Sequence, residues 1–376
     1  MPRTSAALAA AWQQVVAGGE QAYAGAVLLV QHRDAIVWWE ATGWALHPSC
    51  IGDPATPPEV TEPIPMTRHT LFDLASLTKV VATTPIVLQL VAEGLFQLET
   101  PLGQLLPSLA TSPYASATIR HLLTHTAGLP AWLPLYLDAH GEASYATAIA
   151  ETMPIGEPGA QVVYSDLGFI LLGILVQQLT GADLATAARQ RVFAPLGLAS
   201  LQFCPPQSLR RQIAATERGN SYEANNVGAR GHGFPWRTSL IWGEVHDGNA
   251  YYGLDGIAGH AGLFGTAEDL ARYAAAWLHG DELLPGALVA EATTQQASGR
   301  GLGWVCADTS SPLSAPLSMR AFGHTGFTGT MLWVDPLRDL IVVLLTNRVH
   351  PVVREGIQAV RAAVLRELAA AFPARG

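Results

Sequence analysis

The sequence predicts an α+β fold, in which an antiparallel sheet takes strands from both ends of the chain, is flanked by helices and is interrupted by a mainly helical lobe. Short apolar runs with the length of strands occur near the start, at 25–39, and near the end, at 331–334 and 340–345. Helical patterns occupy the middle of the chain. The last segment, 353–372, repeats apolar residues mostly every three or four positions, which predicts an amphipathic helix.

The order of these elements predicts one discontinuous lobe with an insertion. The chain has 376 residues, of which 49% are hydrophobic, and this is enough for two lobes around a large core. We expect residues 1–70 and 265–376 to form an α/β lobe, and residues 71–264 to form the mainly helical lobe. Clefts between lobes commonly hold binding sites, so we expect the functional site at their junction.

The first seventy residues are expected to hold a helix, a hairpin and a loop. Residues 5–17 have a helical pattern. The apolar runs 25–30 and 35–39 flank the polar residues 32–34, which predicts a β-hairpin. Residues 47–65 contain six prolines, so we expect an irregular loop there.

The middle of the chain is expected to be helical and then irregular. A long helical pattern covers 76–95, and two more cover 167–180 and 183–192. The segment 205–253 is rich in Gly, Pro and Asn, which favours loop structure. We find no internal repeat that would indicate a solenoid.

Charge and hydropathy argue against nucleic-acid and membrane partners. The formal net charge is −9, only 14% of the residues are charged, and the basic residues form no stripe. The longest apolar run, 167–176, has about half the length of a membrane span. No secretory signal is recognisable, so we expect a cytoplasmic location, or export if the chain has been trimmed. The three cysteines have no CxxC spacing and predict no disulfide framework.

The basic residues are almost all arginine, with twenty arginines against a single lysine, Lys79. Lys79 follows Ser76 by three positions, at the expected start of the helix 76–95. Residues three apart share a helix face, so the hydroxyl and the amine can meet. The positive end of the helix dipole and burial would lower the pKa of the amine toward a range where it accepts a proton from serine. Arginine cannot do this, because it stays protonated.

Three motifs follow one another along the chain: Ser-x-x-Lys at 76–79, Tyr-Ser-Asp at 164–166 and His-Thr-Gly at 324–326. In this order they resemble the motifs of the serine β-lactamase and penicillin-binding protein family, in its class C-like branch. The resemblance covers nearly the whole chain and implies a β-lactamase/transpeptidase-like fold. It also implies that Ser76 is the acylated nucleophile and that Lys79 is its proton partner.

The second motif adds a phenol. The resemblance places Tyr164 close to Ser76 and Lys79, where it would share the acid/base work. If Lys79 stays cationic it lowers the pKa of the phenol, and a tyrosinate could serve as the base. The family usually has Asn where this chain has Asp166, and Asp166 could accept a hydrogen bond from Lys79 and hold it charged.

The third motif departs from the Lys-Thr-Gly that is usual in β-lactamases. The form with His324 resembles some D,D-peptidases and esterases of this branch, and His324 could donate to a substrate carboxylate or to Tyr164. The resemblance implies an oxyanion hole made by the backbone N–H groups of Ser76 and Phe327. The residues expected to bind the substrate or the oxyanion are Asp166, His324, Thr325, Gly326 and Phe327.

Further segments also resemble this family. They are 118–129, 259–270, in which Thr266 would cap a helix, and 245–250, which is similar to cell-wall-amidase-like members and is expected at the rim of the cleft. Arg348 follows the last strand and could meet a substrate carboxylate.

The interpretation that we favour is that the protein is a serine hydrolase, which cleaves an amide or ester through an acyl-enzyme on Ser76. The substrate stays open among a β-lactam, a D-amino-acid peptide, a muramyl peptide and a simple ester, so the expected partner is a small molecule or a peptidoglycan fragment. The alternative is a penicillin-binding sensor or a non-catalytic binding protein of the same fold. An α/β-hydrolase is disfavoured because no G-x-S-x-G motif occurs.

No cofactor or metal is expected. His121 and His125 are four apart, but Leu122 stands where a zinc-binding H-E-x-x-H motif needs Glu. No Gly-rich phosphate loop is present. The oligomeric state is left open.

Overall fold

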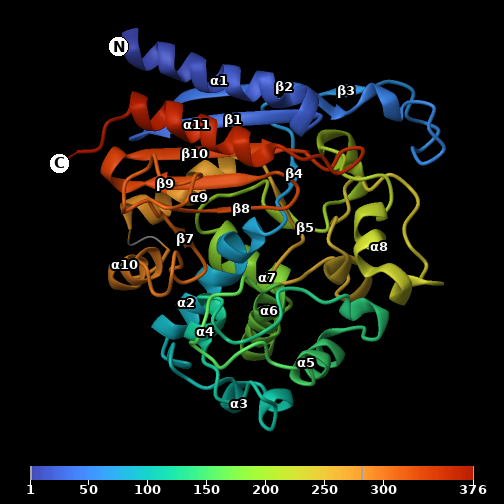
Figure 1. Ribbon diagram of the computed structural model, residues 1–376, viewed down its shortest axis with the longest axis vertical. Helices are drawn as coiled ribbons and strands as arrows, with labels where there is room; N and C mark the ends of the chain where they lie inside the picture. Colours follow the sequence, from blue (N-terminus) through green and yellow to red (C-terminus); the bar gives the residue numbers. More distant parts are fainter. Residues whose placement is uncertain (1, 281–282, 376) are drawn as a thin grey trace.

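The computed structural model describes residues 2–280 and 283–375. Its centre is an antiparallel sheet of seven strands in the order β3-β2-β1-β10-β9-β8-β7 (Figure 1). β1 pairs with β10, so the two ends of the chain meet in the middle of one sheet. The α+β fold with a sheet from both termini is confirmed. The strands are β1 (Gly25–His32), β2 (Ala35–Leu46), β3 (Ile64–Pro65), β7 (Val305–Cys306), β8 (Phe322–Thr325), β9 (Met331–Asp335) and β10 (Leu340–Thr346).

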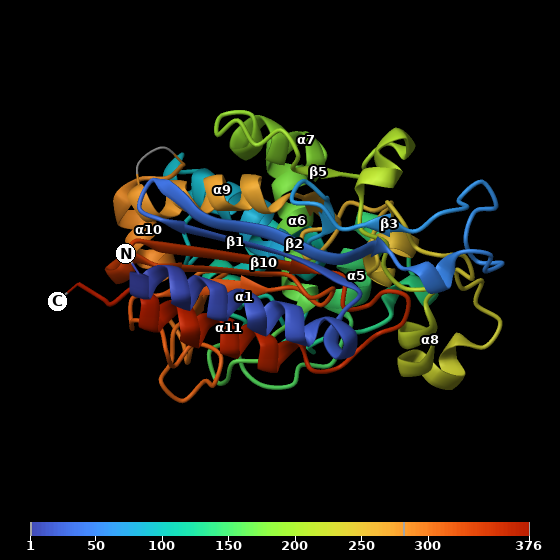
Figure 2. The ribbon, with the colours of Figure 1, turned by 90° about the horizontal axis from the view of Figure 1, so that it is seen from above.

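The centre of the sheet is buried on both faces because β1 and β10 are largely apolar. In β1, Val27 and Leu29 point into one core, whereas Leu28 and Val30 point into a second core on the opposite face. Helices cover both faces, as Figure 2 shows. The helices α1 (Pro2–Ala22) and α11 (Ile357–Ala371) pack together over the second core, and α9 (Ala267–His279) lies against the other face.

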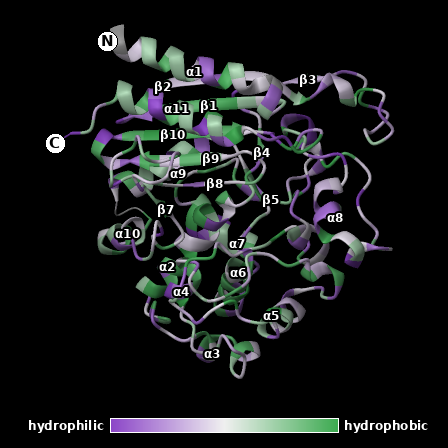
Figure 3. Cartoon of the chain, in the orientation of Figure 1, coloured by the Kyte–Doolittle hydropathy of each residue, from purple (hydrophilic) through white to green (hydrophobic). Residues whose placement is uncertain are grey.

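The helical lobe is built around one apolar helix, α6 (Asp166–Thr180), whose buried residues join the core beneath the sheet. Hydrophobic residues are concentrated in the central strands (Figure 3). A small second sheet consists of β4 (Phe72–Asp73), β6 (Leu263–Gly265) and β5 (Gln202–Phe203), in that order. The other helices are α2 (Thr84–Ala92), α3 (Leu102–Leu105), α4 (Ile119–Leu123), α5 (Glu142–Ala150), α7 (Leu184–Ala188), α8 (Ser221–Val227) and α10 (Gly286–Thr293).

Within the described ranges, no single helix has the length and apolarity needed to cross a membrane. One pair of helical segments, Asp166–Thr180 and Leu184–Phe193, reaches both together, but it is bent by 78°.

Most of the expected elements are present, and the differences are local. The helix expected over 76–95 begins with a wider π-helical turn, Lys79–Thr83, before α2, because the Thr84 N–H bonds to the Lys79 carbonyl. The helix expected over 183–192 divides into α7 and a second π turn, Arg189–Phe193. The irregular segment 205–253 also contains the short helix α8. The proposed boundaries of the two lobes stay a prediction.

Candidate active site

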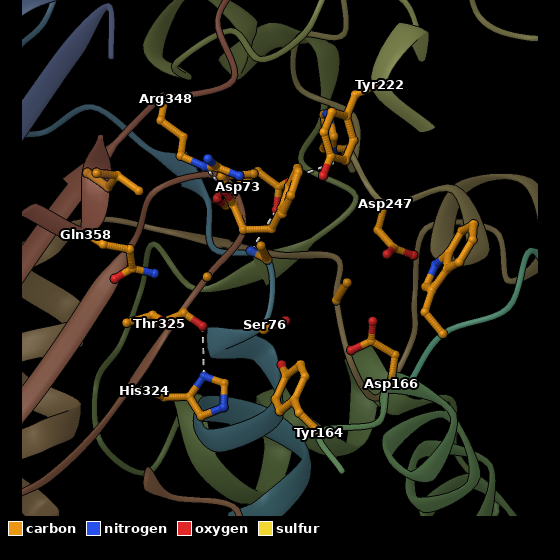
Figure 4. A pocket seen from close by; sticks show the side chains of 18 of the residues that line it. Asp73, Ser76, Tyr164, Asp166, Tyr222, Asp247, His324, Thr325, Arg348 and Gln358 are labelled. Carbon is orange, nitrogen blue, oxygen red and sulfur yellow. Dashed lines mark hydrogen bonds between the residues drawn. The ribbon is translucent and has the colours of Figure 1, made fainter. Parts of the chain in front are cut away.

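A cavity of about 560 Å³ opens between the end of β8 in the main sheet and the helical lobe. Ser76, Tyr164, Asp166 and Thr325 line it, and Figure 4 shows their side chains around one space. The structure therefore brings together the three motifs that are separated by up to 250 positions in the sequence.

Ser76 is held by the chain just before it. The residue preceding it, Ala75, has a left-handed backbone with φ of 47°, which is unfavourable for a residue with a Cβ. Asp73 fixes this turn, because one carboxylate oxygen accepts the Ala75 N–H at 2.8 Å and the other accepts the His246 N–H at 2.7 Å. The Thr330 hydroxyl donates to the Leu74 carbonyl at 3.0 Å. The position of the serine is thus fixed from the sheet and from the loop 245–250.

Lys79 is fully buried and has three acceptors. Its Nζ donates to Ser76 Oγ at 2.9 Å, to Asp166 Oδ1 at 2.7 Å and to the His260 carbonyl at 3.3 Å. Burial alone would lower the pKa of Lys79, but the Asp166 carboxylate and Tyr164 outweigh it, so the pKa lies above its ordinary value. The lowered pKa expected from the sequence is therefore wrong. A carboxylate stands where the family usually has an amide, and it keeps Lys79 an ammonium ion.

Tyr164 lies between Lys79 and the aromatic ring of His125. The Lys79 Nζ is 4.8 Å from the centre of the phenol ring, and the His125 ring centre is 4.6 Å away. Burial raises the pKa of Tyr164 above its ordinary value, although Lys79 opposes the rise, so the resting phenol is protonated. Its position depends on His125, because the His125 ring nitrogen Nδ1 accepts the N–H of Ser165 at 3.1 Å.

His324 is buried on β8, and its Nδ1 lies 2.9 Å from the Thr325 carbonyl. Burial, with the charges of Lys79 and Arg300, holds the pKa of His324 well below its usual range. The imidazole is therefore neutral at pH 7 and does not replace the positive charge of the usual Lys-Thr-Gly motif.

Gly326 and Phe327 form the turn after β8. A Cβ on Gly326 would lie 2.1 Å from Thr330 Oγ1 and 2.6 Å from the Leu74 carbonyl, so only glycine fits. Within the described ranges, neither the Ser76 N–H nor the Phe327 N–H donates to another group of the chain. Both are therefore available to an oxyanion, as the resemblance implies.

Three arginines complete this side of the cavity, and the sequence pointed to only one of them. Arg348 lies over the Phe327 ring at 4.5 Å and its Nε donates to the Phe327 carbonyl at 2.5 Å. Arg361 of α11 donates to the carbonyls of Gly326 and Thr330. Arg300, which no motif singled out, lies 5.2 Å from the centre of the Tyr164 ring. Arg300 is a lone arginine in an irregular segment, and nothing in the sequence distinguishes it from nineteen others.

The segment 245–250 lies at the cavity, where the sequence placed it. Its residues His246 and Asp247 line the space, together with Glu223 of α8, which the sequence did not indicate. The expected helix cap is also present, because Thr266 Oγ1 accepts the Asp269 N–H.

Comparison with known proteins gives one consistent result. The family model described as Beta-lactamase matches residues 7–366. A putative D-alanyl-D-alanine carboxypeptidase of Escherichia coli O157:H7 is 31% identical over 370 residues, which cover 90% of this chain and 80% of the relative.

Two solved structures share the fold. A penicillin-binding protein homologue from Caulobacter crescentus is 22% identical, with a TM-score of 0.72 over 99% of this chain and 98% of the other. A class C beta lactamase from Rhodobacter sphaeroides is 20% identical, with a TM-score of 0.71 over 96% of this chain and 98% of the other. At these identities the likeness concerns the fold alone.

Proposed function

Because the chain belongs to the beta-lactamase family, whose members are hydrolases, we propose that it cleaves an amide or ester bond through an acyl-enzyme on Ser76. The observation that carries this proposal is the buried chain of contacts from Ser76 Oγ to Lys79 Nζ, at 2.9 Å, and from Lys79 to Asp166, at 2.7 Å. A serine next to a buried proton-transfer group is the arrangement that nucleophilic catalysis needs.

In the acylation step, Ser76 Oγ forms a bond to the substrate carbonyl carbon while its proton passes to the Lys79 and Tyr164 pair. Both members of the pair are protonated at rest, so one proton must leave to solvent before the pair can act as the base. The tetrahedral oxyanion is held by the N–H groups of Ser76 and Phe327. When the carbon–nitrogen or carbon–oxygen bond breaks, the pair returns the proton to the leaving group.

Deacylation reverses this sequence with water. The pair takes a proton from water, the resulting hydroxide attacks the acyl carbonyl, and the proton is given back to Ser76 Oγ as the ester bond breaks. Each half-reaction requires that the Lys79 and Tyr164 pair has already lost one proton to solvent. The rate of hydrolysis should therefore increase with pH above neutrality.

The substrate class that we favour is a peptide that ends in a carboxylate. The relative above is named a putative D-alanyl-D-alanine carboxypeptidase. Arg300 and Arg348 line the cavity next to Tyr164 and Phe327, and they supply the positive charge that a neutral His324 lacks. A β-lactam, which also carries a carboxylate, is compatible with the same groups.

The test combines labelling with turnover. A fluorophosphonate probe should label the protein, the Ser76→Ala variant should not be labelled, and the Ser49→Ala variant, changed at an exposed serine, should be labelled as before. Turnover is then measured with nitrocefin, p-nitrophenyl butyrate, a D-Ala-D-Ala peptide and muramyl dipeptide. Labelling that persists in Ser76→Ala would refute the assignment of the nucleophile, and stable labelling without any turnover would favour a sensor.

A further inference from the structure

The cavity has an acidic side that the reaction proposed above does not use. Glu223 of α8 and Asp247 line the cavity together with Ser76. In Figure 4 Asp247 projects into the space from the side opposite to Arg348 and Gln358. Asp166, on the same side, is already neutralised by Lys79, and His260 lies against Asp247, so the question is what compensates the charge that Glu223 adds beside Asp247.

One carboxylate oxygen of Asp247 is held in place by contacts within the protein. Its Oδ1 accepts the Ala250 N–H at 2.8 Å and lies 2.9 Å from Nε2 of His260. The side chain is 24% exposed, and this exposure is toward the cavity, because Asp247 is one of the cavity-lining residues. The carboxylate is thus oriented by the protein while part of it faces the substrate space.

Glu223 forms no ion pair within the described ranges, although Tyr136 and the charge of Arg237 partly oppose the rise of its pKa. The residue is 8% exposed, its Oε2 accepts the Gly248 N–H at 3.0 Å, and its Oε1 has no hydrogen-bond partner. The carboxylate takes the space of a missing side chain, because a Cβ on Gly248 would lie 2.1 Å from Oε1. Burial and the charge of Asp247 raise the pKa of Glu223 to about 7. A buried carboxylate without an ion-pair partner is costly to keep charged, and a cation bound beside it at the more exposed Asp247 would reduce that cost.

We propose that Glu223 and Asp247 form a subsite for an ammonium group, so that the preferred substrates of this site carry a free amino group. The inference rests on the serine hydrolase proposed above and adds its substrate class. An organic cation fits better than a metal, because no group of three His, Cys, Asp or Glu side chains in the described ranges could hold a metal ion. Trp132 and Tyr222 also line the cavity, and aromatic rings near a bound cation can stabilise it.

The subsite is tested in the Ser76→Ala variant, which binds ligands without becoming acylated. The probes are p-nitroanilides of amino acids whose chains contain two to six carbon atoms. The affinity of each probe is measured by calorimetric titration and compared with the affinity of its N-acetylated form, which has the same shape near the scissile bond but carries no charge. We expect that for at least one chain length the amine binds about tenfold more tightly than the acetylated form.

Glu223→Gln and Asp247→Asn, each added to Ser76→Ala, should remove this preference, because both substitutions keep the size of the side chain and remove its charge. Glu355→Gln is the matched control, since Glu355 lines the same cavity next to α11, and it should keep the preference. Each of the two charge-removing variants is a sufficient test by itself. Thermal melting will show whether each one folds, and if one fails to fold the other still tests the subsite.

Equal affinity for amine and acetylated ligands at every length would overturn the subsite, and so would a preference that survives in either variant that folds like its parent. Stabilisation by Ca²⁺ alone, without any effect of the amines, would overturn it as well. None of these outcomes depends on turnover. A protein that fails to be labelled at Ser76 would instead refute the hydrolase mechanism, so the two failures are distinguishable.

Discussion

Replacing Asp166 by Asn restores the residue that the family usually has and removes the charge that stabilises the Lys79 ammonium ion. Removing one partner of a buried ion pair typically costs about 3–5 kcal/mol. Asp166 is 18% exposed, and Asn keeps an oxygen that can accept the 2.7 Å hydrogen bond, so we expect the lower end, about 3 kcal/mol. Once the Asp166 charge is absent, the pKa of Lys79 should fall, because burial is no longer outweighed.

The sign of the pH dependence follows from the raised pKa of Lys79. The contribution of the pair is fully present below the ordinary lysine pKa of 10.5 and is lost as the pH rises through the folded-state value. The stability deficit of Asp166→Asn should therefore be complete between pH 7 and 9 and should shrink above 10.5. Urea denaturation of both proteins at several pH values measures it.

The single lysine makes the pKa itself measurable. Protein grown with lysine labelled with ¹³C at Cε gives one side-chain resonance, and its shift with pH reports the protonation of Lys79 without assignment. The resonance should titrate at lower pH in Asp166→Asn than in the wild type, whereas Glu355→Gln should leave it unchanged. If the wild type and Asp166→Asn titrate at the same pH, Asp166 does not set the charge of Lys79 and the reasoning is refuted.

Three further predictions concern the same site. Lys79→Arg keeps the charge but cannot release a proton, so hydrolysis of p-nitrophenyl butyrate should fall by about 10²–10⁴-fold, and a rate near that of the wild type would contradict the proton-transfer role. Ala75→Gly relieves the strain of the left-handed backbone before the nucleophile. The variant should therefore gain about 1 kcal/mol in stability and react more slowly with fluorophosphonate. If neither the stability nor the labelling rate changes, the backbone at Ala75 is not strained. His324 has a lowered pKa, so the free energy of unfolding should decrease as the pH falls below 6.5, because the unfolded state takes up protons first. The decrease should be smaller in His324→Gln. Equal pH profiles of unfolding for the two proteins would contradict the lowered pKa of His324.

The sequence was sufficient where the interacting residues follow a local pattern. The hairpin of β1 and β2 and the strands β9 and β10 are predicted by short apolar runs around polar turn residues, and the helix α11 by its apolar periodicity. Ser76 and Lys79 meet because they are three positions apart on one turn, which spacing shows directly. The π-helical turn at Lys79 was not foreseen, because its apolar pattern is that of an ordinary helix.

The sequence was insufficient where charges from distant segments decide the chemistry. The pKa of Lys79 depends on Asp166, which is 87 positions away, and a helix-dipole argument that considers only the local turn gives the wrong direction. Arg300 and Glu223 belong to no motif, and only the tertiary structure places them in the cavity. The location of the protein, like the boundaries of its lobes, stays a prediction.

The complete burial of Lys79 also determines how the protein responds to amine chemistry. No lysine ammonium group is exposed, because the single one is enclosed by Ser76, Asp166 and the His260 carbonyl. Succinimidyl esters and aldehydes therefore find no lysine on the folded surface, and cross-linking or immobilisation through lysine is not open to the native protein. Reaction of such a reagent at Lys79 would instead report that the active site has opened, which turns the one lysine into a probe of local unfolding.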